Sequence, residues 1–289
     1  MLGRAWDLLK GSVLSFIADD AMTRGAAIAF YTIFSLAPVL VIAVAIAGYA
    51  FGTETAQEAV TEQVADFMGP QVSELIGSML RSASNFGTGL TATVISLVTI
   101  LVTATAMFGA VESALNMILR VDPPRSSVWA ALRARVLGLA LVISVGLLLV
   151  ALLVINAVLD SVRTYIDLLP HTQEWVWLIN VGISFLLMVA GIAVLYRVLP
   201  NRWLDWREVA MGAVVTALLM VAGRYGISLY MTRAGVASSY GAAGTVFVAL
   251  LWIYYSALIF LFGAEVTRVY AEMRGHWRPV QKEAAAPAE

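Results

Sequence analysis

Polar side chains lie in the middle of apolar segments of this chain. The segment SSYGAAGTVFVALLWIYYSALIFLFGAEV, residues 238–266, places Tyr254, Tyr255 and Ser256 at its centre and Glu265 near its end. A polar group held away from water costs free energy unless it has a hydrogen-bonding partner. Such residues therefore either bond neighbouring helices or line a cavity that water or lipid headgroups can enter.

A proline interrupts another apolar segment, residues 26–51. Pro38 lies near its middle, and a proline there removes a backbone hydrogen bond and kinks the helix. Tyr31 and Ser35 lie on the turns just before it. The kink either shapes a helix bundle or acts as a hinge beside a cavity.

Arg224 is a basic residue that lies well inside an apolar segment, residues 209–231. An arginine at that depth can reach the outer surface with its long side chain, pair with an acid or meet an anionic group. Asp160 lies at a matching depth. We predict that one set of residues lines a cavity or substrate path, and its members are Tyr31, Ser35, Pro38, Arg224, Tyr254, Tyr255 and Ser256.

Three acidic residues are candidates for structural ion pairs. Glu112 and Glu265 lie near the inner ends of their segments, within reach of cytoplasmic arginines, and Asp160 is the candidate partner of Arg224. We expect Glu265 to face these arginines rather than a substrate. We expect Tyr254 and Tyr255 to face segment 26–51.

The side chains that enzymes commonly use are scarce. The chain has no cysteine, and its two histidines, His171 and His276, are far apart. No pattern of closely spaced acids and histidines indicates a metal site, and no nucleophile elbow or phosphate-binding loop is present. We therefore predict no catalytic residue, no bound metal, no cofactor and no enzymatic activity. The net charge of −1 also speaks against a nucleic-acid partner.

The elements that hold these polar residues are predicted from composition. Of 289 residues, 61% are hydrophobic and 13% are charged, and the mean hydropathy is +0.86. A soluble domain carries about a quarter charged residues. Because about 20 apolar residues cross a bilayer as a helix, we predict an all-α membrane protein, a bundle of six transmembrane helices. The spans are expected at about 26–51, 89–111, 136–159, 175–198, 209–231 and 243–267.

The distribution of arginine and lysine predicts the orientation of these spans. Fourteen of these residues lie before span one, between spans two and three, between four and five, or after span six. Three, namely Arg81, Arg163 and Arg233, lie on the opposite side. Because basic residues stay in the cytoplasm, both termini are predicted to be cytoplasmic.

The segments outside the spans show amphipathic patterns. Residues 1–24 are predicted to form an amphipathic helix in the cytoplasmic interface. Residues 53–86 are predicted to form two short helices, broken at Gly69 and Pro70, that cap the outer face. The membrane domain spans 25–271, and 272–289 is a cytoplasmic tail whose end is expected to be disordered.

Four blocks of the sequence resemble one family. The chain is similar to the YihY/BrkB family of bacterial inner-membrane proteins, and the blocks that carry the likeness are AAIAFYTIFSLAPVL (26–40), ESALNMI (112–118), YRVLPNRWLDWREVAMGAVVTALL (196–219) and SSYGAAGTVFVALLWIYYSALIFLFGAEVTRV (238–269). The resemblance implies six spans and a location in the bacterial inner membrane. Members have been labelled ribonuclease BN, and others have been linked to serum resistance or lipid export. The scarcity of catalytic side chains argues against a ribonuclease.

Two functions are compatible with the sequence. A transporter or lipid translocator would use the kinked first span and the polar middle of the sixth as walls of a pathway, with membrane lipids as partners and without an ATPase. A non-catalytic envelope scaffold or regulator would need only the packed bundle. An open cavity that reaches Tyr31, Tyr254 and Arg224 would favour transport. The sequence is compatible with a homo-oligomer.

Overall fold

The computed structural model describes residues 2–84, 106–121, 172–234 and 236–275, together with single positions between 136 and 158. Within this part of the chain every regular element is an α-helix, as the sequence predicts. A shorter helix, Ala106–Ile118, also lies in it. The labelled helices are α1 (Leu2–Ala18), α2 (Ala21–Phe51), α3 (Thr53–Met68), α4 (Pro70–Ser84), α7 (Thr172–Val198), α8 (Trp206–Ala234) and α9 (Val236–Met273).

Several of these helices are long and apolar enough to cross a membrane. Three stretches of the described helices qualify individually, and they are Val181–Val198, Trp206–Ile227 and Gly244–Met273. A fourth is α2 if its two halves are counted as one span. These four coincide with the spans expected at 26–51, 175–198, 209–231 and 243–267. The spans expected at 89–111 and 136–159, and the tail from residue 276, lie largely or wholly outside the described residues.

The helix α2 is bent. Its halves, Ala21–Leu36 and Val39–Phe51, meet at 47°. The bend falls where the sequence has Pro38, and a proline lacks the N–H that would bond to the preceding turn. The bend therefore has a local cause in the sequence.

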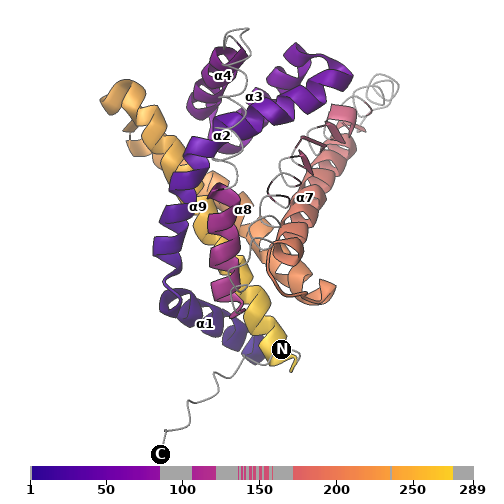
Figure 1. The fold of residues 1–289 in the computed structure, drawn as a ribbon, viewed down its shortest axis with the longest axis vertical. Helices are drawn as coiled ribbons and strands as arrows, with labels where there is room; N and C mark the ends of the chain where they lie inside the picture. The colour runs from indigo at the N-terminus through magenta and orange to yellow at the C-terminus, as the bar shows by residue number, and fades with distance from the viewer. Residues whose placement is uncertain are drawn as a thin grey trace, which may run out of the picture.

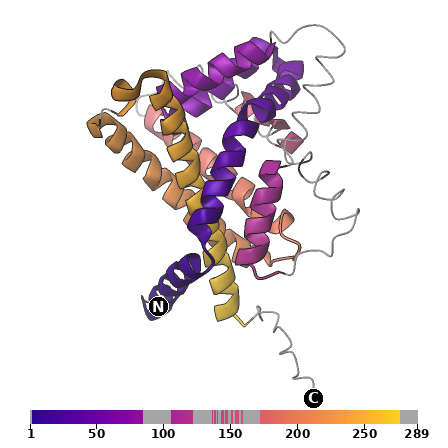
Figure 2. The ribbon, with the colours of Figure 1, turned by 60° about the vertical axis from the view of Figure 1, so that its left-hand side comes forward.

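The longest helix, α9, contacts four of the other labelled helices. They are α8, α2, α1 and α4, and α7 packs on α8. Figures 1 and 2 show α3 and α4 at one end of the molecule, and α1 beside the C-terminal part of α9 at the opposite end. Gly52 and Gly69, both with φ of 91°, let the chain turn between α2, α3 and α4.

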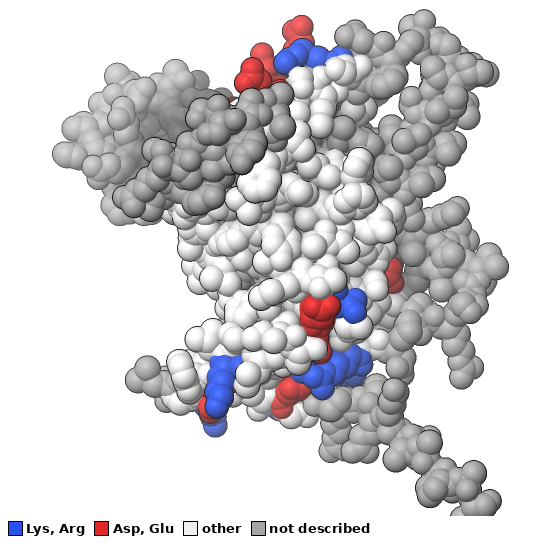
Figure 3. Space-filling model, turned by 90° about the vertical axis from the view of Figure 1, so that its left-hand side faces the viewer, with Lys and Arg blue, Asp and Glu red and all other residues white. Residues whose placement is uncertain are grey.

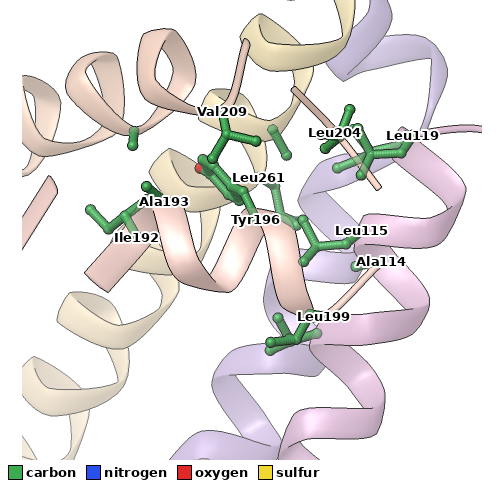
Figure 4. Packing of buried hydrophobic residues seen from close by; sticks show 14 of the residues in the cluster. Ala114, Leu115, Leu119, Ile192, Ala193, Tyr196, Leu199, Leu204, Val209 and Leu261 are labelled. Carbon is green, nitrogen blue, oxygen red and sulfur yellow. The ribbon is translucent and has the colours of Figure 1, made fainter. Parts of the chain in front are cut away.

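A hydrophobic cluster joins α7, α8 and α9 to the helix Ala106–Ile118 (Figure 4). Its largest aromatic member is Tyr196, which is buried on α7. A second cluster lies toward α3 and α4 and includes Ala47, Val60, Ile76 and Val248. Both clusters bury small and branched side chains where helices cross.

One face of the molecule is largely apolar between its two ends. On the face shown in Figure 3, charged side chains gather toward the ends, and the area between them is largely uncharged. Exposed large apolar side chains in this chain include Phe30, Phe34, Leu186, Leu218 and Tyr225. A broad exposed apolar surface needs an apolar partner, and lipid chains provide one.

Candidate functional site

A groove of about 670 Å³ lies between α1, α8 and α9. It is at the end of the molecule where α1 crosses the last turns of α9 (Figure 1). Two of its side chains are cationic and most of the others are apolar. The lining residues are Arg4, Ala5, Leu8, Met211, Tyr270, Met273 and Arg274.

Helical spacing places the groove residues together. Arg4 and Leu8 are four residues apart on α1, and Tyr270 and Arg274 are four apart on α9, so each pair lies on one helix face. The Arg274 guanidinium lies 5.7 Å from the centroid of the Tyr270 ring, within the range of a cation–π contact. Each helix thus brings one arginine and one large side chain to the groove.

Close packing holds α1 against α9. The rings of Phe16 and Phe262 meet edge to face with centroids 5.9 Å apart. Gly11 lies against Val269, where a Cβ would be 3.1 Å from a Val269 methyl group. These contacts fix the side of α1 that faces the groove.

The chemistry of the groove suits an anionic amphiphile. A guanidinium group presents parallel N–H donors that match the oxygens of a phosphate or a carboxylate. Leu8, Met211 and Met273 offer apolar surface beside these donors. A ligand with an anionic head and an apolar chain would satisfy both parts.

A buried charged cluster lies on α9. Glu265 is fully buried, and its Oε2 accepts hydrogen bonds from Arg268 Nη2 at 2.8 Å and Nε at 3.2 Å. Arg268 Nη1 donates to Glu272 Oε1 at 2.6 Å. Glu265 therefore pairs with an arginine one turn along its own helix, and Arg268 joins two acids.

Glu112 lies in a polar contact between two parts of the chain that are distant in sequence. Its Oε1 accepts a hydrogen bond from Asn201 Nδ2 at 3.2 Å, and the Asn201 N–H donates to Asn116 Oδ1 at 2.9 Å. The block ESALNMI thereby contacts the loop LPNRW between α7 and α8. Arg197 closes this loop, because its Nη1 donates to the Leu204 carbonyl at 3.1 Å.

The two tyrosines at the middle of α9 face different helices. Tyr254 lies beside Gly25 on α2, as expected. The same expectation is wrong for Tyr255, whose hydroxyl donates to the carbonyl of Leu219 on α8 at 3.3 Å. Successive residues of a helix point about 100° apart, so both rings cannot face one neighbour. Ser256 is half-buried beside them.

The residues around the bend of α2 do not share one environment. Tyr31 is 42% exposed and contacts the ring of Phe30, with centroids 5.8 Å apart. Ser35 is fully buried, and its hydroxyl contacts the carbonyl of Thr32 and Sδ of Met107 at 3.2 and 3.1 Å. Pro38 lies at the bend itself.

Arg224 is exposed on α8 and makes contacts of its own. Asp160, its candidate partner, lies outside the described residues. The groove contains none of the seven residues predicted to line a path. Those seven residues therefore lie in separate places, which are the surface, the contact between α8 and α9, and the bend of α2.

Sequence reasoning missed the groove residues. From the sequence, Arg4 and Arg274 are only two of the basic residues expected in the cytoplasm, and Tyr270 lies at the end of a span, where tyrosines are common. The spacing of four on each helix was a usable signal. The crossing of α1 over the end of α9, which pairs the two faces, is a tertiary contact that local spacing does not reveal.

Comparison with known proteins identifies the family of the chain. A 27% identical relative in Alcanivorax borkumensis is matched over 277 residues, which cover 93% of this chain and 62% of that protein. A 30% identical relative in Pseudomonas aeruginosa is matched over 86% of this chain and 59% of its own length, and another in Ralstonia nicotianae over 95% and 63%. All three are described as UPF0761 membrane proteins.

This chain spans about three fifths of the length of those relatives. No solved structure matches it. The sequence model of the family described as virulence factor BrkB matches residues 13–288, nearly the whole chain. Together with its apolar helices, these likenesses establish a membrane protein, and the chain belongs to the BrkB family of membrane proteins, the UPF0761 family.

Proposed function

We propose that this protein is a transporter or translocator of an anionic lipid, or of a similar envelope amphiphile, in the bacterial inner membrane. The groove between α1, α8 and α9 is its binding site for the anionic headgroup. The observation that carries this proposal is the presence of both Arg4 and Arg274 in a groove that is otherwise mostly apolar, at one end of the helices. Membrane lipids are the corresponding partners, and no catalytic step is involved.

The position of the groove supports a lipid as the ligand. It lies at the end of α9, a span candidate, where that helix leaves the apolar zone. The helix α1 lies beside it, and the exposed side chains of α1 include Trp6, Leu9 and Val13. Such an amphipathic helix rests at a lipid–water boundary. A headgroup at that boundary could enter the groove while its chains remain in the bilayer.

The transport proposal includes a topology of six spans with both termini in the cytoplasm. In that orientation the groove faces the inner leaflet, because α1 and the end of α9 are on the cytoplasmic side. The chain shows no nucleotide-binding loop, so movement would follow a gradient or be coupled to an ion.

The test compares lipid retention and movement in matched variants. In proteoliposomes with fluorescent phosphatidylglycerol, we expect the parent to carry the label between leaflets and to retain anionic lipid through purification. We expect Arg4→Gln with Arg274→Gln to lower both at least about tenfold, or about 1.4 kcal/mol of binding free energy, because the headgroup loses both charged donors. Arg207→Gln, exposed on α8 outside the groove, is the control.

Equal retention and movement of anionic lipid in the double variant and the parent would contradict the role of the groove. A zwitterionic lipid that binds as well as phosphatidylglycerol would contradict the choice of an anionic ligand.

A non-catalytic scaffold is the second candidate, and one observation favours it. The helices α8 and α9 approach closely at Gly212 and Gly263, which lie directly against side chains and backbone of the facing helix. A rigid seam of this kind suits a scaffold. Retention of anionic lipid with no movement between leaflets, in the parent itself, would support this function instead.

A further inference from the structure

Two carboxyl groups meet where the corner between α1 and α2 crosses α9. Asp19 lies in that corner, and its side chain interacts with that of Glu265. Each contributes one buried oxygen that has no hydrogen-bond partner among the residues the structure describes, and these oxygens are Asp19 Oδ2 and Glu265 Oε1. The other oxygen of Glu265 is already bonded twice to Arg268.

The backbone holds the corner in place. Asp20 adopts a left-handed conformation with φ of 50°, which ends α1 and starts α2. The Asp19 N–H bonds the Ser15 carbonyl at 2.8 Å, and Arg24 Nε donates to the Asp19 carbonyl oxygen at 3.4 Å. The carboxyl group of Asp19 thus remains directed at α9 while its backbone is bonded elsewhere.

The charged groups around this contact do not balance. On α9, Arg268 binds both Glu265 and Glu272, so one guanidinium faces two acids before Asp19 is counted. On α8, Gly212 lies against Gly263 and Thr267, and the buried acid Glu208 accepts a hydrogen bond from the Asp205 N–H at 3.4 Å. On α2, Arg24 is the cation at the corner, and its Nε donates to the Asp19 carbonyl rather than to the carboxyl group. Three acids, Asp19, Glu265 and Glu272, thus lie around two guanidinium groups.

Two ionised carboxylates in this contact would be unstable. A buried carboxylate oxygen that lacks a hydrogen-bond partner destabilises the fold, and two carboxylates at close range repel. One proton between them removes both problems, because the protonated group donates an O–H to the carboxylate that faces it. A multivalent cation would need more oxygen ligands, and the residues the structure describes contain no group of three acids, histidines or cysteines placed to hold one.

We propose that Asp19 and Glu265 form a binding site for a single proton, shared between the two carboxyl groups and linking the α1–α2 corner to α9. The proton bonds one carboxyl oxygen and is hydrogen-bonded to the oxygen of the other. Its release to water leaves two carboxylates face to face, and their repulsion weakens the attachment of the corner to α9.

This site can govern the groove, a consequence that rests on the proposed function. The helix α1 ends in the Asp19 corner and lines the groove with Arg4 and Leu8. Loosening of the corner would move α1 relative to α9 and change the distance between Arg4 and Arg274. A proton gradient would then be the source of free energy for movement of the amphiphile.

Infrared spectroscopy of the purified full chain in lipid nanodiscs tests the proton site directly. At about pH 7 we expect the parent to show the carbonyl stretch of a protonated carboxylic acid, and we expect this band to shift in deuterium oxide. Asp19→Asn and Glu265→Gln should each abolish it, because the amide donates to the remaining carboxylate and replaces the proton. Asp7→Asn, exposed on α1, should leave it unchanged.

Asp19→Asn decides the outcome if Glu265→Gln does not fold, since it leaves the ion pair of Glu265 with Arg268 intact. The proposal is overturned if the parent shows no such band, or if the band persists in Asp19→Asn. The infrared band can be measured in the parent and in Asp19→Asn without any transport. If the proposed function is wrong, the band of the parent should therefore remain. In liposomes that translocate lipid, an imposed pH gradient should change the rate for the parent and not for Asp19→Asn.

Discussion

The hydroxyl of Tyr196 joins three helices. Its single proton can be donated to the carbonyl of Phe260 on α9 or to the Thr216 hydroxyl on α8, which lies 2.8 Å away, and its ring is buried on α7. The Thr216 hydroxyl also bonds the Gly212 carbonyl at 2.8 Å. A polar group in such an apolar contact specifies which residues of the three helices meet.

Tyr196→Phe removes this hydroxyl and keeps the ring. We expect the free energy of unfolding to fall by about 0.5–2 kcal/mol, because hydrogen bonds between membrane helices contribute modestly and their loss leaves the partners unbonded. Thermal unfolding in detergent measures the change. Tyr225→Phe is the control, since Tyr225 is 73% exposed on α8. An equal loss in both variants would show that the Tyr196 hydroxyl has no special role.

At the scale of elements, α8 and α9 approach each other at two glycines. A Cβ on Gly212 would overlap the Thr267 hydroxyl and the Gly263 carbonyl, and a Cβ on Gly263 would overlap the Thr216 hydroxyl. Small residues let membrane helices pack with their backbones close, where dispersion and hydrogen bonds act together. The same seam carries the Tyr255 contact further along α8.

Gly212→Ala should push α8 away from α9. We expect a loss of about 1–3 kcal/mol in unfolding free energy, because the added methyl group meets backbone as well as a side chain and neither can move freely. Gly226→Ala on the same helix has nothing within 4 Å of the new Cβ and should be neutral or stabilising by up to about 1 kcal/mol. The two melting temperatures, measured together, separate overpacking from helix propensity. A Gly212→Ala protein as stable as the parent would contradict the close seam.

At the scale of the whole molecule, basic and acidic residues are divided unequally between the helices. The helix α3 carries acids such as Glu54, Glu58 and Glu62, whereas Arg4 and Arg274 line the groove at the opposite end. On the face drawn in Figure 3, charged side chains of both signs lie at each end. Basic residues remain on the cytoplasmic side of bacterial membranes. This division is the basis of the proposed orientation, and it places the groove toward the cytoplasm.

Cysteine labelling tests that orientation in a chain that has no cysteine of its own. Glu62→Cys, exposed on α3, should react with a membrane-impermeant maleimide in intact cells. Asp7→Cys, exposed on α1, should react only after the membrane is permeabilised. The counted label on each variant, before and after permeabilisation, is the measurement. Labelling of Asp7→Cys in intact cells would reverse the topology and move the groove to the outer leaflet.

Local features of the chain could be predicted because their causes are local. Pro38 bends α2 since proline cannot donate the backbone hydrogen bond, and Gly69 separates α3 from α4 since glycine tolerates its positive φ. Runs of apolar residues indicate span candidates because a bilayer sets their length. The four family blocks were also visible in the sequence.

The partners of the polar residues depended on the tertiary structure. Two helices pack through a few residues each, and the spacing along one helix does not say which helix it will meet. For this reason the sequence does not show that Tyr255 packs on α8, or that Asp19 lies against Glu265. The sequence by itself determined that this is a helical membrane protein with buried polar groups. Only the packing of α1 and α2 on α9 decided that two carboxyl groups would meet at the corner and that Arg4 and Arg274 would line one groove.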